Sequence, residues 1–109
     1  MKITVTGRKL HITDGIRDHL NRKMNKAITD LDDETDIHVS LYVEKHRQFA
    51  EFTVKKRGLN FYSHYETNDL YESMGKALEK MKKQLQKHKD KIKDLRTKNG
   101  SNLKNQILN

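Results

Sequence analysis

The feature that most constrains the fold is a long periodic stretch from Asp69 to about Arg96. Its apolar residues recur at steps of three and four, as on one stripe of a helix, and are Leu70, Met74, Leu78, Met81, Leu85, Ile92 and Leu95. At about 100° per residue, a second set falls on the opposite side, consisting of Lys76, Lys80, Lys83 and Lys87. A third set, Lys82, Lys89 and Lys93, lines one flank of the stripe. The stretch predicts a helix that packs by one side and presents ammonium groups on the other, although lysine also commonly fills a solvated helix surface.

Capping residues place the starts of two helices. Asp69 with Glu72 three residues later resembles a capping box at the start of the long helix. Thr13 followed by Asp14 suits the start of an earlier helix, because hydroxyl and carboxylate oxygens accept from the open N–H groups there. The apolar stripe of this earlier helix is Ile16, Leu20, Met24, Ala27, Ile28 and Leu31. We expect the acidic turn 32–34 to end it, with Arg22 and Lys26 away from the stripe and Lys23 at its edge.

Four segments have the pattern of strands. Apolar residues alternate strictly with polar ones over 37–44, and the same alternation recurs over 50–55. A short first strand is predicted over 2–6, before the break at 7–9, and a last one over 59–66. Phe61, Tyr62 and Tyr65 crowd both faces of that last strand. The polar run 45–48 and the dipeptide Arg57-Gly58 suit the connections between strands, with Gly58 able to adopt a positive φ.

The predicted order is strand, helix, three strands, helix. Two amphipathic helices and a sheet with one apolar face favour an α+β fold, a two-layer β-α-β-β-β-α sandwich whose four-stranded sheet carries both helices on one face. The length of 109 residues suits one domain, which we place at residues 1–96. Because 99–102 looks like a loop, residues 97–109 are expected to form a flexible C-terminal tail.

The positive charge is unevenly distributed along the chain. Residues 1–68 hold 12 Lys and Arg against 10 Asp and Glu, a net +2, whereas residues 69–109 hold 11 against 5, a net +6. Such a field favours a polyanion such as nucleic acid, or an anionic membrane surface. The chain has no cysteine, and it shows neither a signal peptide nor a segment apolar enough to span a bilayer. We therefore expect a cytoplasmic protein.

Few residues have the spacing of a catalytic or metal-binding site. The six histidines form no ligand pair at helical spacing, and His38 and His64, both in strands, are more typical of packing or surface residues than of a metal site. No serine has a nucleophile-elbow context and no glycine-rich loop could cradle phosphates. Nothing supports an enzyme, a cofactor or a small-molecule substrate. Aromatic residues are not concentrated beside the lysines, so phosphate contact with structured RNA fits better than base stacking on single strands.

Three segments carry a family resemblance. The run Ile3-Thr4-Val5-Thr6-Gly7-Arg8 with Ile12-Thr13-Asp14 is similar to the opening of the bacterial ribosome hibernation promoting factors and ribosome-associated inhibitor A. The run from Val43 to Glu51 matches as well. So does Asn68-Asp69-Leu70-Tyr71, continuing into the lysine-rich stretch 80–89. The three matches occur in the family's order and together cover about residues 1–95.

This resemblance implies a fold reminiscent of double-stranded-RNA-binding domains. It also implies a partner, the small ribosomal subunit and its rRNA, bound in the channel used by mRNA and transfer RNA. Occupying that channel would repress translation in stress or stationary phase by steric occlusion. The family's rRNA contacts would fall on Arg8, Lys23, Lys26, Lys80, Lys83, Lys87 and Lys89. From Asp69 we expect a helix cap and from Tyr71 a packed ring. Off the ribosome we expect a monomer.

Two aspects remain open at this level. The tail 97–109 matches neither the short family members that promote ribosome dimers nor those that oppose them. An alternative of a different class is a regulatory protein that binds a transcription factor or another protein through an exposed sheet face bearing Ser40, Tyr42, Thr53 and Lys55. An RNA-processing enzyme is the least favoured reading.

Overall fold

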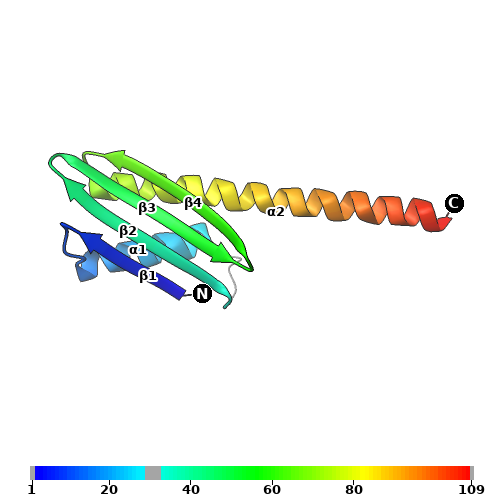
Figure 1. Cartoon of the computed structure of the whole chain (residues 1–109), viewed down its shortest axis with the longest axis horizontal. Helices are drawn as coiled ribbons and strands as arrows, with labels where there is room; N and C mark the ends of the chain where they lie inside the picture. The colour runs from blue at the N-terminus through cyan, green and yellow to red at the C-terminus, as the bar shows by residue number, and fades with distance from the viewer. Residues whose placement is uncertain (1, 29–32, 109) are drawn as a thin grey trace.

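The computed structural model describes the backbone of residues 2–28 and 33–108, and the side chains of residues 2–28 and 33–95. Its elements are β1 (Lys2–Arg8), α1 (Asp14–Ala27), β2 (Thr35–Glu44), β3 (Arg47–Lys56), β4 (Leu59–Thr67) and α2 (Leu70–Leu108). Figure 1 shows α2 running along the sheet and then well beyond it. The predicted order of strands and helices is confirmed.

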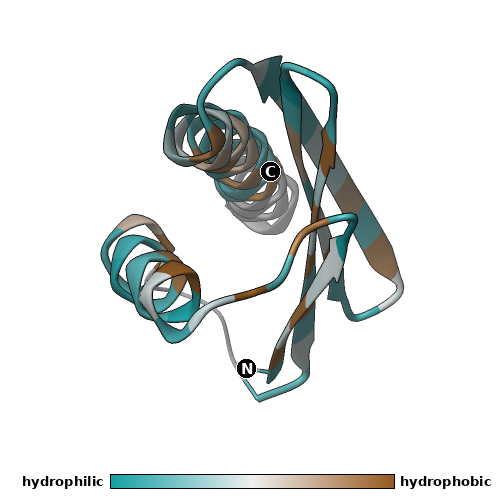
Figure 2. Ribbon diagram, turned by 90° about the vertical axis from the view of Figure 1, so that its left-hand side faces the viewer, coloured by the Kyte–Doolittle hydropathy of each residue, from teal (hydrophilic) through white to brown (hydrophobic). Residues whose placement is uncertain are grey.

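The four strands form one mixed sheet in the order β1-β2-β3-β4. β1 pairs with β2 in parallel, and the other two pairings are antiparallel. Seen end-on in Figure 2, α1 and α2 lie on the same side of this sheet. The predicted two-layer α+β sandwich is therefore confirmed.

The core lies between the sheet and the two helices. The alternation in β2 and β3 turns one set of side chains inward, and the stripes of α1 and α2 meet them. The fully buried large side chains are Phe52, Leu20, Met24, Ile37, Leu41, Met74, Met81, Val39 and Val54. Burying each such side chain contributes about 1.5–3 kcal/mol. The aromatic residues of β4 also alternate between the two faces of the sheet. Phe61 and Tyr65 pack against the core, while Tyr62 points outward and is 51% exposed.

Three hydroxyl groups fix α2 against the sheet. Ser63 Oγ in β4 donates to the carbonyl of Ala77 at 2.8 Å, in a buried position. Ser73 Oγ donates to the carbonyl of Gln48 at 2.7 Å and lies 2.7 Å from Thr67 Oγ1. These directional bonds hold the rotation of α2 about its axis. That rotation decides which of its lysines face outward.

The cap of α2 differs from the predicted capping box. Asp69 Oδ1 accepts from the backbone N–H of Tyr71 at 3.0 Å, so the expected cap is present. The backbone N–H of Asp69, however, donates to Thr67 Oγ1 at 3.0 Å and not to Glu72. Thr67 satisfies this donor first because it lies just before the helix. Thr13 caps α1 as predicted, accepting from Ile16 N–H at 3.1 Å.

Three predicted boundaries are wrong. α1 ends at Ala27, because Ile28 is extended with its side chain buried in the core; Leu31 lies outside the described residues. β1 continues through Gly7 to Arg8, since parallel pairing with β2 extends as far as Tyr42. α2 has no loop at 99–102 and continues as a helix to Leu108. One glycine costs a helix only about 1 kcal/mol, and the chain has no proline to stop it. The division into a domain at 1–96 and a flexible tail at 97–109 stays a prediction.

The tight turn between β3 and β4 follows the prediction. Lys56 pairs with Leu59, which leaves Arg57 and Gly58 as a two-residue loop. Both have positive φ, 47° and 80°, as a type I′ turn requires. Among residues 2–28 and 33–108, no helix is at once long enough and apolar enough to cross a membrane.

Candidate nucleic-acid interface

The lysines opposite the packed stripe of α2 all face solvent. Lys76, Lys80, Lys83 and Lys87 are exposed, because Met74 and Met81 point into the core and fix the opposite side outward. Within the described part of the chain, Lys76, Lys83 and Lys87 make no ion pair or hydrogen bond. We call these three the outer lysines. Their ammonium groups are available to an external anion.

Lys80 differs from the outer lysines because it also contacts the sheet. Its Nζ donates to the carbonyl of His64 at 3.2 Å and lies 5.3 Å from the centre of the Tyr65 ring. One turn later, Gln84 donates to the carbonyl of Tyr62 at 2.6 Å. Four residues of helix rise about 6 Å and two residues of strand about 6.6 Å. The spacing from Lys80 to Gln84 along α2 therefore matches the spacing from His64 to Tyr62 along β4. Lys80 is therefore partly a structural residue.

Lys89 lies on a different side of α2. It follows Tyr71 by 18 residues (89 − 71), which is five whole helical turns, so both are on one line along α2. That line faces α1, because the Tyr71 ring meets the His19 ring edge-on at 4.8 Å. Tyr71 is nonetheless 47% exposed, so the expected packed ring is only half packed.

Two predicted cations come from α1. Lys23 and Lys26 are both exposed, and Lys26 lies in the last turn, where a cation suits the helix dipole. Lys23 lies one turn after His19. Burial, followed by the nearby charges of Lys23 and Arg22, lowers the pKa of His19 below its usual value. The imidazole therefore stays neutral beside these cations near pH 7.

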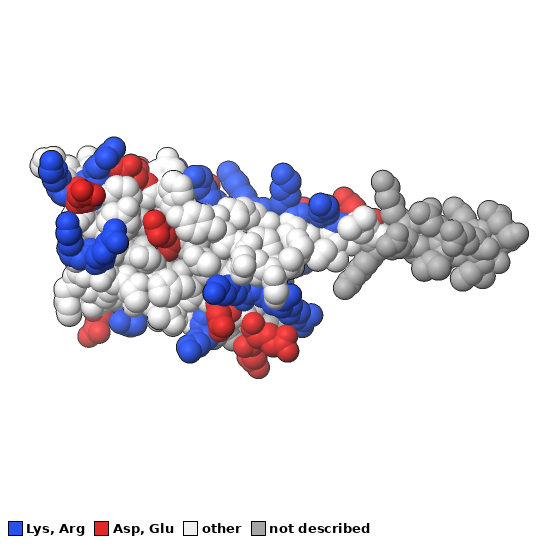
Figure 3. All heavy atoms as spheres, in the orientation of Figure 1, with Lys and Arg blue, Asp and Glu red and all other residues white. Residues whose placement is uncertain are grey.

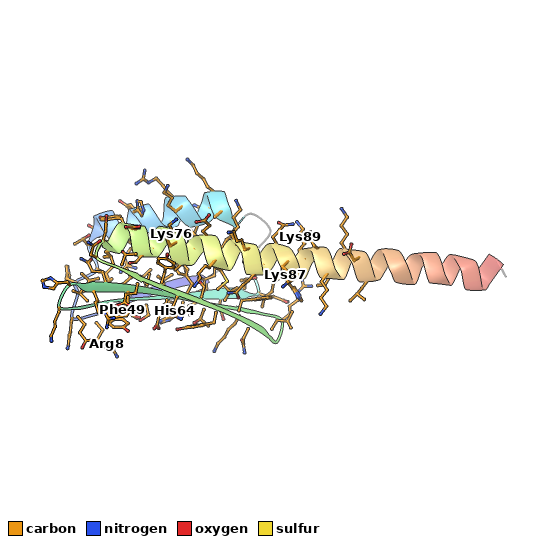
Figure 4. The ribbon with its side chains drawn as sticks, turned by 90° about the horizontal axis from the view of Figure 1, so that it is seen from above. Arg8, Phe49, His64, Lys76, Lys87 and Lys89 are labelled. Carbon is orange, nitrogen blue, oxygen red and sulfur yellow. The ribbon has the colours of Figure 1, made fainter. Side chains whose placement is uncertain are left out.

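Arg8 is separated from the other six predicted residues. It lies on the face of the sheet that points away from the helices, as Figure 4 shows beside the labelled lysines of α2. Its guanidinium carbon is 4.6 Å from the centre of the Tyr42 ring. The structure thus brings the α1 and α2 lysines onto the helix side and leaves Arg8 on the other side. The alternation of side chains along β1 places Arg8 on the outward face, and the family resemblance alone did not indicate that position.

Sequence reasoning overlooked some cations. Lys76 was on the predicted row but was not among the residues implied by the family, although it is exposed, as Lys83 is. Lys9 and Lys45 flank Arg8 and Tyr42 and are exposed. Their proximity depends on strand register, for which the sequence gives no direct signal.

The outward sheet face has a mixed character. Figure 3 views it and shows Lys and Arg gathered where β1 ends and β2 turns into β3, and along the part of α2 beyond the sheet. The centre of this face has few charges. Partnered polar groups occur across it: Arg47 pairs with Glu66, and Thr6 Oγ1 lies 3.0 Å from His38 Nε2.

No metal site emerges among the described residues. No three His, Cys, Asp or Glu side chains there come close enough to hold an ion. His38 and His64 lie on β2 and β4 with β3 between them, and His64 contacts the Tyr62 ring at 5.7 Å. The arrangement offers charged and stacking contacts.

The chain is similar to known proteins over most of its length. The family model described as sigma 54 modulation protein / S30EA ribosomal protein matches residues 3–93. The chain is 31% identical to a ribosome hibernation promoting factor of Klebsiella oxytoca over 93 residues, covering 85% of this chain and 98% of that one. It is 31% identical to one of Azotobacter vinelandii over 91 residues, covering 84% and 85%.

Two solved structures are similar in fold. A ribosomal subunit interface protein from Coxiella burnetii aligns with a TM-score of 0.75 at 26% identity, covering 83% of this chain and 99% of that one. The N-terminal domain of Protein Y from Thermus thermophilus aligns with a TM-score of 0.73 at 29% identity, covering 81% and 99%. Both alignments cover most of this chain.

Proposed function

Because the chain belongs to the sigma 54 modulation protein / S30EA ribosomal protein family, we propose that it is a ribosome hibernation factor that binds the small ribosomal subunit. The names of its relatives support a role in ribosome hibernation, and the name of the structural neighbour from Coxiella burnetii supports a place at the ribosomal subunit interface. Such a role places it in the cytoplasm. It binds rRNA phosphates and represses translation without catalysing a reaction.

The observation that carries this proposal is the row of outer lysines. Three ammonium groups project from one side of a helix that is pinned to the sheet by Ser63 and Ser73. Ribosomal RNA is a dense array of phosphates, and point-charge contacts to it position a protein without reading sequence. Because the helix is rigid, little conformational freedom is lost when its cations meet phosphates.

The proposed mechanism is occlusion of the channel used by mRNA and transfer RNA. The folded domain is held by one continuous core, so it fills space as a rigid body. Occupancy alone prevents the other ligands from binding. Inhibition should therefore be stoichiometric with subunits and reversed by removing the protein, with no chemical change to the RNA.

Co-sedimentation with purified small subunits over a salt series tests this proposal. Each phosphate contact contributes about 0.7–0.9 to the slope of log affinity against log salt, so five to seven contacts predict a slope of roughly −4 to −6. The double variant Lys83→Glu/Lys87→Glu should bind roughly a hundredfold more weakly, because it places like charges against phosphates.

A control variant of equal charge separates this effect from net charge. Lys2→Glu/Lys55→Glu changes the formal charge from +8 to +4, as does the first pair, since each replacement removes two units. Lys2 and Lys55 line a shallow hollow on the outward sheet face. Equal loss of binding by both variants, or a salt slope near zero for the native chain, would refute the proposal.

The same pair of variants tests the alternative function. The hollow on the outward sheet face is lined by groups of both signs, including Lys2, Asp36 and Lys55, which suits a protein partner better than a polyanion. A regulatory protein acting through this face would lose its partner in Lys2→Glu/Lys55→Glu. It would keep that partner in Lys83→Glu/Lys87→Glu.

A further inference from the structure

A stack of three planar groups is built across the outward sheet face. Strand register aligns Arg8, Tyr42, Phe49 and Glu66 in one row over all four strands. The Tyr42 and Phe49 rings are nearly parallel, 4° apart, with centres separated by 4.2 Å. The guanidinium of Arg8 covers the other side of Tyr42, its carbon 4.6 Å from the ring centre. Figure 4 shows Arg8 and Phe49 near the same end of the sheet.

Arg8 is the open end of this stack. It lies on the edge strand β1, it is exposed, and it makes no ion pair with any residue that the structure describes. A guanidinium is planar and stacks on flat π-systems by either side, while its N–H groups can donate in its plane. One side of Arg8 rests on Tyr42. The opposite side and the N–H edge are available to a ligand.

Further cations lie at the same end of the sheet as Arg8. Lys9 follows Arg8, and Lys45 lies in the β2–β3 turn, just beyond Tyr42. Both are exposed, and neither is ion-paired within the described residues. With Arg8 and Arg47 they give four positive charges against two negative charges on the neighbouring Glu44 and Glu66, a net +2.

The remainder of the outward face lacks this excess. There, Lys2 and Lys55 are balanced by Asp36 and Glu51, a net charge of zero. A ligand that joins a flat ring to flanking anions therefore fits the Arg8 end and no other part of the face. A nucleotide in a single strand has this chemistry, because its base stacks and its phosphates bind cations.

We propose that the Arg8–Tyr42–Phe49 stack binds an unpaired nucleobase of RNA, with Lys9 and Lys45 on the adjoining phosphates. This inference rests on the proposed function and adds a second RNA contact, on the side of the sheet opposite the outer lysines. Tyr42 and Phe49 lie on the side of the sheet opposite the α2 lysines, at the end where these other cations are. Strand pairing therefore supplies the stacking surface that the sequence pattern did not support.

The direct test is fluorescence titration with a short single-stranded RNA that carries one 2-aminopurine. Stacking on the native chain should quench the probe in a saturable way, and the same sequence annealed as a duplex should bind more weakly. Arg8→Lys keeps the charge but removes the planar group, and Tyr42→Leu removes the ring beneath it. Each should weaken single-strand binding by about five- to a hundredfold, the usual effect of losing one stacked base.

Tyr62→Leu is the matched control. Tyr62 lies on the same outward face and is 51% exposed, but its hydroxyl is bonded to Glu51 and it is not part of the stack. Its replacement should leave quenching unchanged. In the native chain, ring-proton shifts of Tyr42 and Phe49 on titration should report the same event without any substitution, so a variant that fails to fold does not decide the outcome.

Three results would overturn the inference: no quenching by the native chain, unchanged quenching with Arg8→Lys, or equal affinity for single strand and duplex. Binding of a protein in place of RNA at this face would appear as the first of these. Co-sedimentation keeps the two proposals distinguishable. If the native chain fails to bind small subunits, the proposed function fails. If it binds them, and the stack variants behave like the native chain in both assays, only the stack inference fails.

Discussion

The two sides of α2 contrast in what their residues do. The inner side buries Met74, Met81 and their neighbours against the sheet. Among the described residues, every buried side-chain nitrogen or oxygen has a hydrogen-bond partner. The outer side carries lysines that make no ion pair or hydrogen bond within the described chain. Lys80 lies between the two and shares both characters. Stability and RNA binding should therefore be separable along the circumference of one helix, and graded substitutions can test that separation.

The inner side should give the largest loss of stability. Met81→Ala removes a fully buried side chain that the core cannot easily replace, so the free energy of unfolding should fall by about 2–5 kcal/mol. Denaturant titration measures this change. The salt slope of subunit binding, measured where the variant is still folded, should equal that of the native chain. A changed slope with little loss of stability would contradict the separation.

Lys80 should show a mixed effect. Lys80→Met keeps the aliphatic stem over Tyr65 but removes the hydrogen bond to the His64 carbonyl, so the free energy of unfolding should fall by about 0.5–1 kcal/mol. Subunit binding should weaken as well, because one cation is lost. Denaturant titration and co-sedimentation on the same preparation test both parts. An effect confined to binding would show that the bond to β4 contributes nothing.

Lys83→Met is the matched outer substitution. Lys83 lies three residues from Lys80, has the same charge and makes no bond to the sheet. Its replacement should change the free energy of unfolding by less than about 0.5 kcal/mol, while the salt slope becomes shallower by about 0.7–0.9. If stability falls as much as with Lys80→Met, the outer lysines are not independent of the fold.

The smallest expected effect concerns pH and His19. Its pKa is lowered in the folded chain by burial and then by Lys23 and Arg22, so the unfolded chain binds the proton more readily. The stability associated with neutral His19 is therefore present above the usual pKa near 6.5 and is lost as pH falls through the lower, folded-state value. Unfolding free energies of the native chain and His19→Asn, compared at pH 7.5 and pH 5, should converge at the lower pH. A difference that grows on acidification would have the wrong sign.

The sequence predicted the features that depend on a single segment and missed those that depend on how segments pair or pack together. Period-two and period-3.6 patterns are local, so they predicted the strands, the helices and the outward side of Lys83 correctly. The extension of β1 to Arg8 depends on pairing with β2, and the end of α1 depends on Ile28 entering the core. Neither follows from a pattern within one segment.

The same distinction applies to the residues of the candidate site. The outer lysines could be predicted, because helical geometry alone arranges them. The stack at Arg8 could not, since it joins residues of three strands whose neighbours are set by register. The half-packed ring of Tyr71 was missed for a related reason, because its exposure depends on how closely α1 approaches α2.

The bonds from Lys80 and Gln84 to β4 have a consequence for how copies of the protein can associate. The carbonyls of His64 and Tyr62 are the groups that an incoming strand would have to capture at that border of the sheet. Endless strand-by-strand polymerisation requires every molecule to be open at both borders. Because side chains of α2 already occupy the edge of β4, a folded copy can join at most one neighbour in this way. Fibre growth would first require α2 to dissociate from β4.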